Sequence, residues 1–308
     1  MELPQGFPEI EHPEGNEYSY ERWELGKRLF YDPIMSKDGL VSCASCHDPK
    51  LAFSDNEDVS KGSAGLLGTR NSPSLANVAY HPYFTREGGV PTLEMQILVP
   101  IQEHNEFNNN IVLIADTLAK IPSYVEMAKT AYDQEPNAFV ITRALAQFER
   151  SLISGQSSYD LEFNYNIEGA MSASALRGKE LFGSERTSCS NCHSGFNFTN
   201  YSFENNGLYE DYEDTGRERL TQDPSDRALF KVPTLRNVEV TGPYMHDGSI
   251  ASLSEVVDHY NNGGSDHMHK SELIRPLQLT NEEKKDLVEF LYALTDQKFI
   301  TNKNFSNE

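Results

Sequence analysis

The sequence of 308 residues predicts an all-α fold made of two domains that are related by duplication. Apolar residues recur at helical spacing along the chain, and no alternating strand pattern of useful length is found. The pentapeptide Cys-x-x-Cys-His occurs at residues 43–47 and again at residues 189–193. Because the segments around the two pentapeptides also recur in the same order, we interpret the chain as two copies of one module.

The repeat extends well beyond the pentapeptides. Residues 26–30 (GKRLF) precede the first copy and residues 178–182 (GKELF) precede the second. Residues 73–78 (PSLANV) and 233–238 (PTLRNV) follow them. The length suits two domains of about 150 residues each. We therefore expect an extended arm, a first domain and a second domain at residues 1–16, 17–156 and 157–308.

The expected helices follow this division. Four lie in the first domain and three in the second, at residues 20–30, 110–121, 123–132, 136–155, 172–182, 252–260 and 281–296. Pro136 suits the first turn of its helix, and Ser252 with Glu255 and Thr280 with Glu283 match the capping-box pattern. Residues 155–158 (GQSS) predict a hinge, and residues 48–89, which are dense in Gly, Pro, Asn and Ser, predict a long loop around a cofactor.

The two pentapeptides contain all four cysteines of the chain, namely Cys43, Cys46, Cys189 and Cys192. In such a motif the thiols bind the two vinyl groups of a haem, and the adjoining histidine, His47 or His193, ligates the iron. A pair of disulfides or a zinc site would not explain why a histidine directly follows the second cysteine in both copies. The sequence therefore predicts two covalently attached haem c groups.

The net charge of −21 argues against nucleic acid as a partner and allows a basic redox partner protein, although most of the surplus Asp and Glu could equally form a solubilising surface. No run of 18 apolar residues is present, so no membrane span is expected. Haem c is attached after export, which predicts a periplasmic protein. Residues 1–4 (MELP) lack the pattern of a signal segment, so we expect that a leader has been removed, and a lipid anchor stays open.

The two copies differ on the segment expected to pass the open face of each haem. Alignment of Leu93 with Leu253 places Pro100 opposite Tyr260. A tyrosine oxygen can bind ferric iron and proline offers no side-chain donor. We therefore expect His193 and Tyr260 on the second iron, and an open iron on His47.

Other assignments stay open at this point. Tyr260 could instead be a buried tyrosine with a hydrogen-bonded hydroxyl, and Met245 or Met268 could supply the ligand. His259 would point about 100° away from Tyr260 around the same helix, so the two neighbours cannot both ligate.

Gln96 and Glu106 flank the segment around Pro100. Reduction of peroxide needs a base that takes a proton and an acid that returns it, and a carboxyl in a partly dry pocket can do both. Glu106 is therefore a candidate for proton transfer and Gln96 for orientation. His81 and His104 are alternative pocket residues, although a solvent-facing histidine is the default.

These features resemble the bacterial di-haem cytochrome c peroxidases and the related enzyme MauG, over residues 25–294. The resemblance implies two cytochrome c-like haem domains with long loops around the haems, and it implies Gln96 and Glu106 as catalytic residues. It also implies a calcium ion between the haems, held by Asn71 and the carbonyls of Thr241 and Pro243. The signatures that carry the resemblance are residues 25–33, 42–47, 70–73, 230–237 and 243–248.

The chain departs from the peroxidases in three places. Residues 61–65 (KGSAG) lack the removable histidine of the peroxidases that need reductive activation, so the first haem should be open at rest. Tyr260 stands where those peroxidases have methionine and MauG has tyrosine. The tryptophan that the family places between the haems falls on Arg86, and Tyr83 or Tyr244 are the alternatives for that role.

The sequence thus favours a periplasmic oxidoreductase that reduces hydrogen peroxide at the His47 haem, while the second haem relays or stores oxidising equivalents. Its electron donor would be a small cytochrome or cupredoxin. The alternatives are MauG-like oxidation of a protein side chain, and a non-enzymatic electron carrier or haem sensor in which both irons have a sixth ligand.

Overall fold

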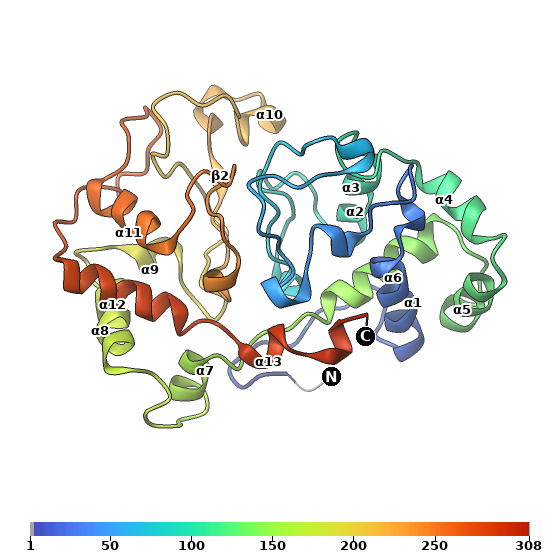
Figure 1. Ribbon diagram of the computed structural model, residues 1–308, viewed down its shortest axis with the longest axis horizontal. Coiled ribbons are helices and arrows are strands. Elements are labelled where there is room, and N and C mark those ends of the chain that lie inside the picture. Colours follow the sequence, from blue (N-terminus) through green and yellow to red (C-terminus); the bar gives the residue numbers. More distant parts are fainter. Residues whose placement is uncertain (1–2, 308) are drawn as a thin grey trace.

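The computed structural model describes residues 3–307, so residues 1–2 of the expected arm lie outside the described part of the chain. The first half of the chain, in blue and green, and the second half, in yellow to red, lie side by side (Figure 1). The prediction of a helix-rich fold is confirmed. It needs one correction, because β1 (Phe203–Glu204) and β2 (Phe230–Lys231) form a short antiparallel pair.

The first half is organised around α1 (Tyr20–Tyr31), which packs against α6 (Ala138–Arg150). Their apolar faces, together with α4 (Ile111–Leu118) and α5 (Pro122–Tyr132), form the first core. The short helices α2 (Leu93–Gln96) and α3 (Leu98–Gln102) precede α4 in the chain, and they contact α6 and α4, respectively. The 3₁₀ turns of this half are at Pro33–Met35, Cys43–Ser45, Pro49–Leu51, Ser63–Gly65 and Val78–Tyr80.

The second half repeats this plan with α8 (Ala173–Phe182) packed against α12 (Asn281–Tyr292). Its core also includes residues of α11 (Leu253–Asn262). The shorter elements are α7 (Ser158–Phe163), α9 (Cys189–Cys192), α10 (Glu218–Thr221), α13 (Gln297–Ile300) and the 3₁₀ turns Pro224–Asp226, Val238–Val240 and Lys303–Phe305.

The main helix crossing has the same geometry in both halves. A Cβ on Gly26 of α1 would overlap the carbonyl oxygen of Ala144 in α6, and a Cβ on Gly178 of α8 would overlap that of Asp286 in α12. Only glycine lets the two backbones approach so closely. The glycine shared by the GKRLF and GKELF segments thus supports the proposed duplication.

Most predicted helices are present, with corrected ends. Ser252 and Thr280 cap α11 and α12 through the predicted capping boxes. The helix predicted from Pro136 begins at Ala138 instead, because the Asn137 side chain accepts a hydrogen bond from the Val140 N–H and acts as the cap. It ends at Arg150, five residues before the predicted end, and α12 ends at Tyr292 instead of residue 296.

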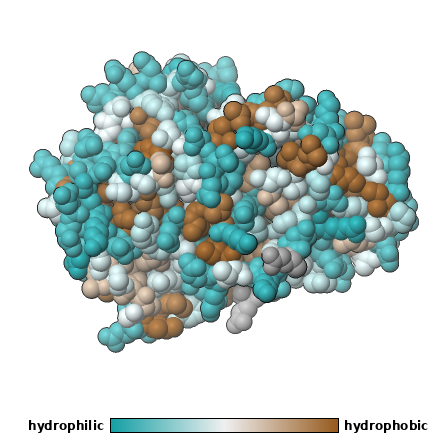
Figure 2. Space-filling view, viewed as in Figure 1, coloured by the Kyte–Doolittle hydropathy of each residue, from teal (hydrophilic) through white to brown (hydrophobic). Residues whose placement is uncertain are grey.

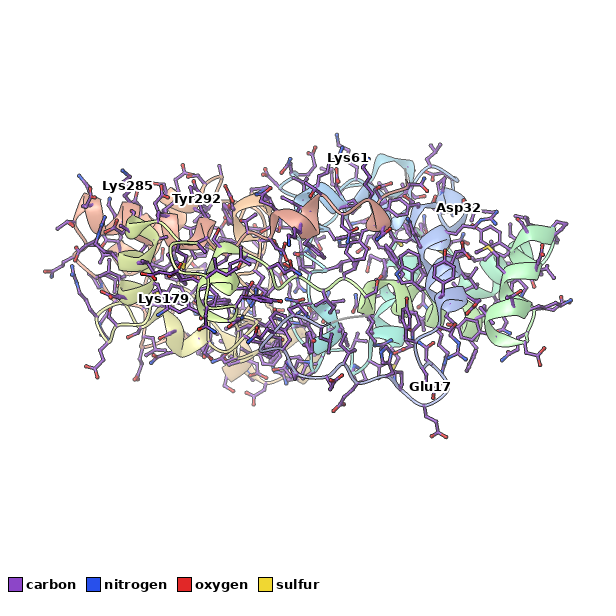
Figure 3. The ribbon with its side chains drawn as sticks, turned by 90° about the horizontal axis from the view of Figure 1, so that it is seen from below. Glu17, Asp32, Lys61, Lys179, Lys285 and Tyr292 are labelled. Atoms are coloured by element: carbon purple, nitrogen blue, oxygen red, sulfur yellow. The ribbon has the colours of Figure 1, made fainter. Side chains whose placement is uncertain are left out.

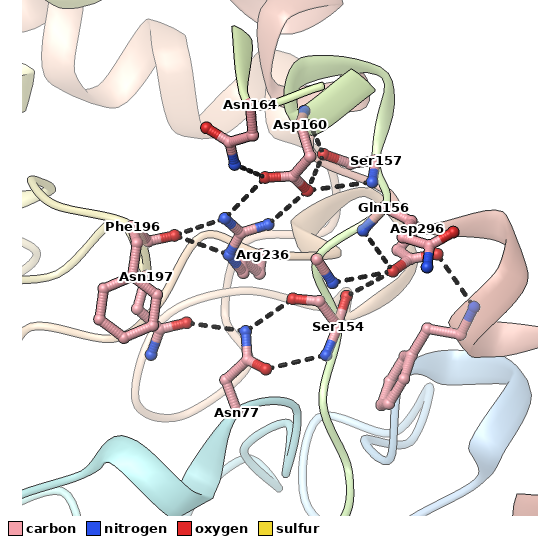
Figure 4. A network of polar contacts seen from close by, with 12 residues as sticks. Asn77, Ser154, Gln156, Ser157, Asp160, Asn164, Phe196, Asn197, Arg236 and Asp296 are labelled. Carbon is pink, nitrogen blue, oxygen red and sulfur yellow. Dashed lines mark hydrogen bonds and ion pairs between the residues drawn. The ribbon is translucent and has the colours of Figure 1, made fainter. Parts of the chain in front are cut away.

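The prediction of a hinge at residues 155–158 is wrong. The carboxylate of Asp296 accepts hydrogen bonds from the N–H groups of Gly155 (3.0 Å) and Gln156 (2.9 Å). Figure 4 shows Asp296 beside Gln156. Ser157 then caps α7 through a capping box with Asp160. In the segment between the halves Gly155 and Ser157 are buried, Gln156 and Ser158 are half-buried, and the distant Asp296 fixes the backbone.

The end of the chain crosses back to the first half. Phe299 of α13 belongs to the first core, although it lies in the region expected to form the second domain. Figure 1 shows α13 at the lower edge of the molecule, near both termini and beneath α6 of the first half. A third, small cluster of Val78, Phe84, Leu93 and Ala146 lies in the first half. The division at residue 156 stays a prediction, and the crossing segment ties the two halves together.

The surface is strongly polar. The face in Figure 2 is mostly hydrophilic with scattered hydrophobic groups, and Glu17, Lys61 and Lys285 project from the molecule in Figure 3. Among the helices of residues 3–307, none has the length and apolar character needed to cross a membrane.

Candidate functional site: two Cys-x-x-Cys-His motifs and the cavity between them

The first motif begins in the 3₁₀ turn Cys43–Ser45 and ends with His47. The Nδ1 atom of His47 lies 2.7 Å from the carbonyl oxygen of Phe53. Such a bond fixes the ring and leaves Nε2 as the atom available to a metal. Burial lowers the pKa of His47, which favours the neutral, metal-binding form.

The second motif repeats this arrangement on α9. The Nδ1 atom of His193 lies 3.1 Å from the carbonyl oxygen of Phe198, and burial lowers the pKa of this histidine as well. Cys189 and Cys192, like Cys43 and Cys46, are free thiols. Free thiols and an available Nε2 in each motif fit two covalent haems, and they do not fit the alternative of a disulfide in each motif.

A cavity of about 400 Å³ adjoins the second motif and extends toward the first half of the chain. Tyr260 of α11 lies in its wall together with Cys189, Cys192 and His193. Burial raises the pKa of Tyr260 to about 12, so the phenol keeps its proton at neutral pH unless a cation displaces it.

The structure separates the alternatives to Tyr260. Met268 is 84% exposed and is not in the cavity wall, and the Nε2 atom of His259 is bonded to the Asn206 carbonyl (2.9 Å). Met245 does line the cavity, but its sulfur lies 3.1 Å from the Asn206 amide nitrogen. Tyr260 and Met245 are thus the side chains of this set that line the cavity, and Tyr260 is close enough to Cys189 and Cys192 for their charges to affect its pKa.

Pro100 changes the corresponding segment of the first half. The ring of a proline clashes with the carbonyl four residues earlier, here that of Gln96. The helix is accordingly interrupted at Ile97 between α2 and α3, whereas α11 runs without a break through Tyr260. The first half therefore offers neither a donor side chain nor a continuous helix at this position.

Glu106 follows this interruption and lies close to the first motif. Its charge contributes to the raised pKa of Cys43 and Cys46, after the larger effect of burial. Burial, and to a lesser extent the charge of Glu103, raises the pKa of Glu106 itself to about 7. Glu106 is nonetheless an exposed residue, so the surrounding protein encloses its carboxyl while part of its surface stays open to solvent. It is therefore a carboxyl that can exchange protons near neutral pH beside Cys43 and Cys46.

The loop of residues 61–65 is held against Glu106. The Ser63 N–H donates to the Glu106 carbonyl (2.7 Å), and Gly62 is so close to Asn105 and Glu106 that a Cβ would overlap their backbone. The Asp38 carboxylate accepts from the Ala64 N–H (2.7 Å), which contributes most to lowering the pKa of Asp38 to about 2. The loop without a histidine is therefore anchored at both sides.

Gln96 and His81 line the cavity from the first half. The Oε1 atom of Gln96 and the Nε2 atom of His81 are buried and have no hydrogen-bond partner within residues 3–307. Burial lowers the pKa of His81 to about 3, so this ring stays neutral. His104 is exposed, as the default expectation had it.

Some, but not all, of the residues expected in the site line this cavity. It brings Gln96 together with Tyr260 and the second motif, and its wall does not include Pro100, Glu106 or the first motif. Two titratable groups near these sites, the half-buried Lys231 and the buried Glu149, were not recognised from the sequence. Lys231 lines the cavity, and Glu149, which adds to the raised pKa of Cys43, has no signal other than its place in an apolar helix.

The expected calcium site does not fit the structure. Asn71, Thr241 and Pro243 do lie in the wall of the same cavity. However, the guanidinium of Arg86 donates to the backbone oxygen of Asn71 (2.8 Å) and to its Oδ1 atom (3.1 Å). The oxygen expected to bind calcium is therefore engaged by a cation of the protein itself.

Comparison with known families agrees with this geometry. The profile of the family described as Di-haem cytochrome c peroxidase matches residues 20–166. The methylamine utilization protein MauG of Methylorubrum extorquens is 37% identical, over 94% of this chain and 82% of that protein. The cytochrome c551 peroxidase of Nitrosomonas europaea is 34% identical, over 88% of this chain and 79% of that protein.

Solved structures of similar proteins have the same fold as this chain. A crystal structure of a MauG-like protein associated with microbial copper homeostasis superposes with a TM-score of 0.94 and 32% identity, and the match covers 99% of this chain and 97% of that one. The diheme peroxidase BthA of Burkholderia thailandensis, with 23% identity and a TM-score of 0.77, covers 92% of this chain and 88% of that one and shares the fold.

Proposed function

We propose that this chain, which belongs to the di-haem cytochrome c peroxidase and MauG family, reduces hydrogen peroxide at the haem carried by Cys43, Cys46 and His47. Membership of this family implies an oxidoreductase with two haem c cofactors. The iron supplies the redox chemistry when the haem is bound. Peroxide takes up two electrons and two protons and leaves as two molecules of water.

The observation that carries the proposal is the position and the pKa of Glu106. A group with a pKa of about 7 is present in both protonation states at neutral pH, so it can take a proton from peroxide and return one to the departing oxygen. Pro100 supports the same assignment, because it leaves this segment without a side-chain donor for iron. Gln96 lines the cavity on the side of the first half, and its buried Oε1 atom has no partner among residues 3–307. From there its amide would orient peroxide without transferring a proton, provided that the cavity reaches the first haem.

The second haem would be held by Cys189, Cys192, His193 and Tyr260. A phenolate ligand stabilises the more oxidised iron, so this haem would store or relay oxidising equivalents and would accept electrons poorly from an ordinary cytochrome. We place the protein in the bacterial periplasm, where haem c is attached. Its partner would be a small cytochrome or a cupredoxin, and the net charge of −21 favours a basic one.

MauG-like oxidation of a protein side chain is the second candidate. Tyr260 and the 37% identity to MauG favour it. The two activities differ in the reductant. A peroxidase oxidises a reduced cytochrome or cupredoxin in many turnovers, whereas a MauG-like enzyme consumes peroxide only with its protein substrate.

The proposal is tested by the reaction of the ferric two-haem protein with peroxide in stopped flow. Glu106→Gln removes the proton-transferring group and keeps the size of the side chain, and it should slow the reaction by about 100-fold or more while both haems stay attached. Glu103→Gln is the matched control on the same loop and should change the rate little at neutral pH. An unchanged rate in Glu106→Gln would refute the assignment.

A further inference from the structure

Arg86 belongs to the first half of the chain and lies in the wall of the cavity that residues of both halves line. Its backbone is fixed on the second half, because the Lys231 N–H donates to the Arg86 carbonyl oxygen (2.6 Å). Its guanidinium contacts Asn71 through Nη2. Arg86 therefore sits between the halves, close to where the family resemblance expects a calcium ion.

The contacts of Arg86 are those of a cation held by oxygen dipoles. The backbone oxygen and the side-chain oxygen of Asn71 both accept from Nη2, and no described residue forms an ion pair with Arg86. The neighbouring carboxylates of Asp247, Asp214 and Glu87 have other partners. Asp247 accepts from the Tyr209 hydroxyl (2.6 Å), Glu87 binds Arg70 and Arg219, and Asp214 binds Arg70. A neutral pair of oxygens is the same kind of ligand that calcium would use.

Arg86 also keeps free donor capacity toward the cavity. Its Nε atom is buried and has no hydrogen-bond partner among residues 3–307. Burial, followed by repulsion from Arg70, lowers the pKa of Arg86 to about 10, so the side chain remains a cation at neutral pH. A buried donor on a cation requires an acceptor, and the carboxylates of a haem are acceptors of suitable charge.

We propose that the guanidinium of Arg86 is the resident cation between the two haem sites and takes the place of a calcium ion at Asn71. Calcium binds oxygen at 2.3–2.6 Å. An ion on Oδ1 of Asn71 would thus lie very close to the guanidinium nitrogen that is already bonded to the same atom, and the two positive charges would repel each other. The site holds one cation, and the protein carries it as a side chain.

The proposal concerns the cation requirement and is independent of the reaction catalysed. If Arg86 replaces calcium, the purified two-haem protein should contain iron and no stoichiometric calcium after dialysis in the presence of calcium. Treatment with EGTA should leave the optical spectrum and the thermal unfolding midpoint unchanged. One calcium per chain, together with a spectral or stability change on its removal, would overturn the proposal.

A variant then tests the assignment to Arg86. Arg86→Gln removes the charge and frees Asn71, while Thr241 and Pro243 keep their places in the cavity wall. This variant should gain calcium dependence, measured as a rise in the unfolding midpoint and one bound calcium per chain by isothermal titration. Lys231→Gln is the matched control, because Lys231 lines the same cavity and donates to the Tyr83 carbonyl instead of Asn71. It should not respond to calcium.

If the Arg86→Gln protein folds and does not respond to calcium, the proposal that the guanidinium occupies the calcium position is wrong. If this variant does not fold, Arg86→Lys provides the second test. Lysine retains the positive charge but lacks the planar fork. It should therefore fold without calcium, and a calcium requirement in this variant would contradict the proposal. The calcium content of the parent protein decides the question in either case.

Discussion

The side chains of Asp160 and Arg236 form a bidentate ion pair, with Nη1–Oδ2 and Nη2–Oδ1 distances of 2.8 and 3.0 Å, and neither side chain is exposed. Figure 4 shows that Asp160 also binds Ser157 at the start of α7, and that Arg236 also binds the Phe196 carbonyl. The pair thus joins the segment between the halves to the loop that follows the second Cys-x-x-Cys-His motif.

Replacing Asp160 by Asn should destabilise the protein by about 3–5 kcal/mol, because removal of one partner leaves the Arg236 charge buried without compensation. The measurement is chemical unfolding followed by circular dichroism. Glu135→Gln is the control, since Glu135 and its partner Lys129 are both exposed (62% and 55%), and it should change stability by no more than ~1 kcal/mol. Equal effects of the two variants would contradict this account.

The sequence predicted features that depend on local spacing. The capping boxes of Ser252 and Thr280 involve residues three positions apart, so their outcome follows from the chain itself. The Cys-x-x-Cys-His motifs are local in the same sense. Each brings its histidine close to the cysteines whatever the rest of the fold does.

The features that were not predicted depend on contacts between distant residues. Residues 155–158 have the composition of a hinge, but the carboxylate of Asp296, about 140 positions later, binds their N–H groups. Asn77 and Asn237, which are equivalent in the two copies, also both bind Ser154. In the site, the contact of Arg86 with Asn71 depends on the direction of one long side chain, which spacing does not reveal.

Glu149 should make the stability of the protein decrease as the pH rises. Burial raises its pKa from 4.5 to about 8. The pKa of Glu149 is higher in the folded than in the unfolded protein, so its contribution to the free energy of unfolding is fully present below about pH 4.5. This contribution is lost as the pH rises through about 8, at up to about 1.4 kcal/mol per pH unit. Unfolding measured from pH 5 to 9 should show this loss relative to Glu149→Gln, which does not titrate.

Glu135→Gln again serves as the control for Glu149, because its carboxyl is exposed. The parent and Glu135→Gln should have the same pH dependence, while the advantage of Glu149→Gln over the parent should grow between pH 5 and 8. Parallel curves for Glu149→Gln and the parent would show that Glu149 ionises in the folded protein as it does in the unfolded chain.

The rate of reaction with peroxide should rise with pH through about 7, since Glu106 must be ionised to take a proton and burial raises its pKa to that value. The rate constant is measured by stopped flow between pH 5 and 9. In Glu103→Gln the midpoint should move to lower pH, because the charge of Glu103 contributes to the raised pKa of Glu106. A midpoint near 7 that persists in Glu106→Gln would assign the titration to another group.

The resting ferric protein should contain one high-spin and one low-spin haem, because Pro100 offers no ligand where the second copy has Tyr260. Electron paramagnetic resonance at neutral pH measures both populations. Tyr260→Phe removes the oxygen ligand and should abolish the low-spin signal alone, with the high-spin signal of the His47 haem unchanged.

Tyr244→Phe is the matched control, since Tyr244 lines the same cavity but donates its hydroxyl proton to the Val238 carbonyl (3.0 Å). It should keep both signals. If Tyr260→Phe also keeps the low-spin signal, Met245 becomes the candidate ligand, because its sulfur faces the same cavity and needs only to leave the Asn206 amide. Met245→Leu would then abolish the signal. Two low-spin haems in the parent protein would instead mean that the first iron is closed at rest, which would favour an electron carrier over a peroxidase.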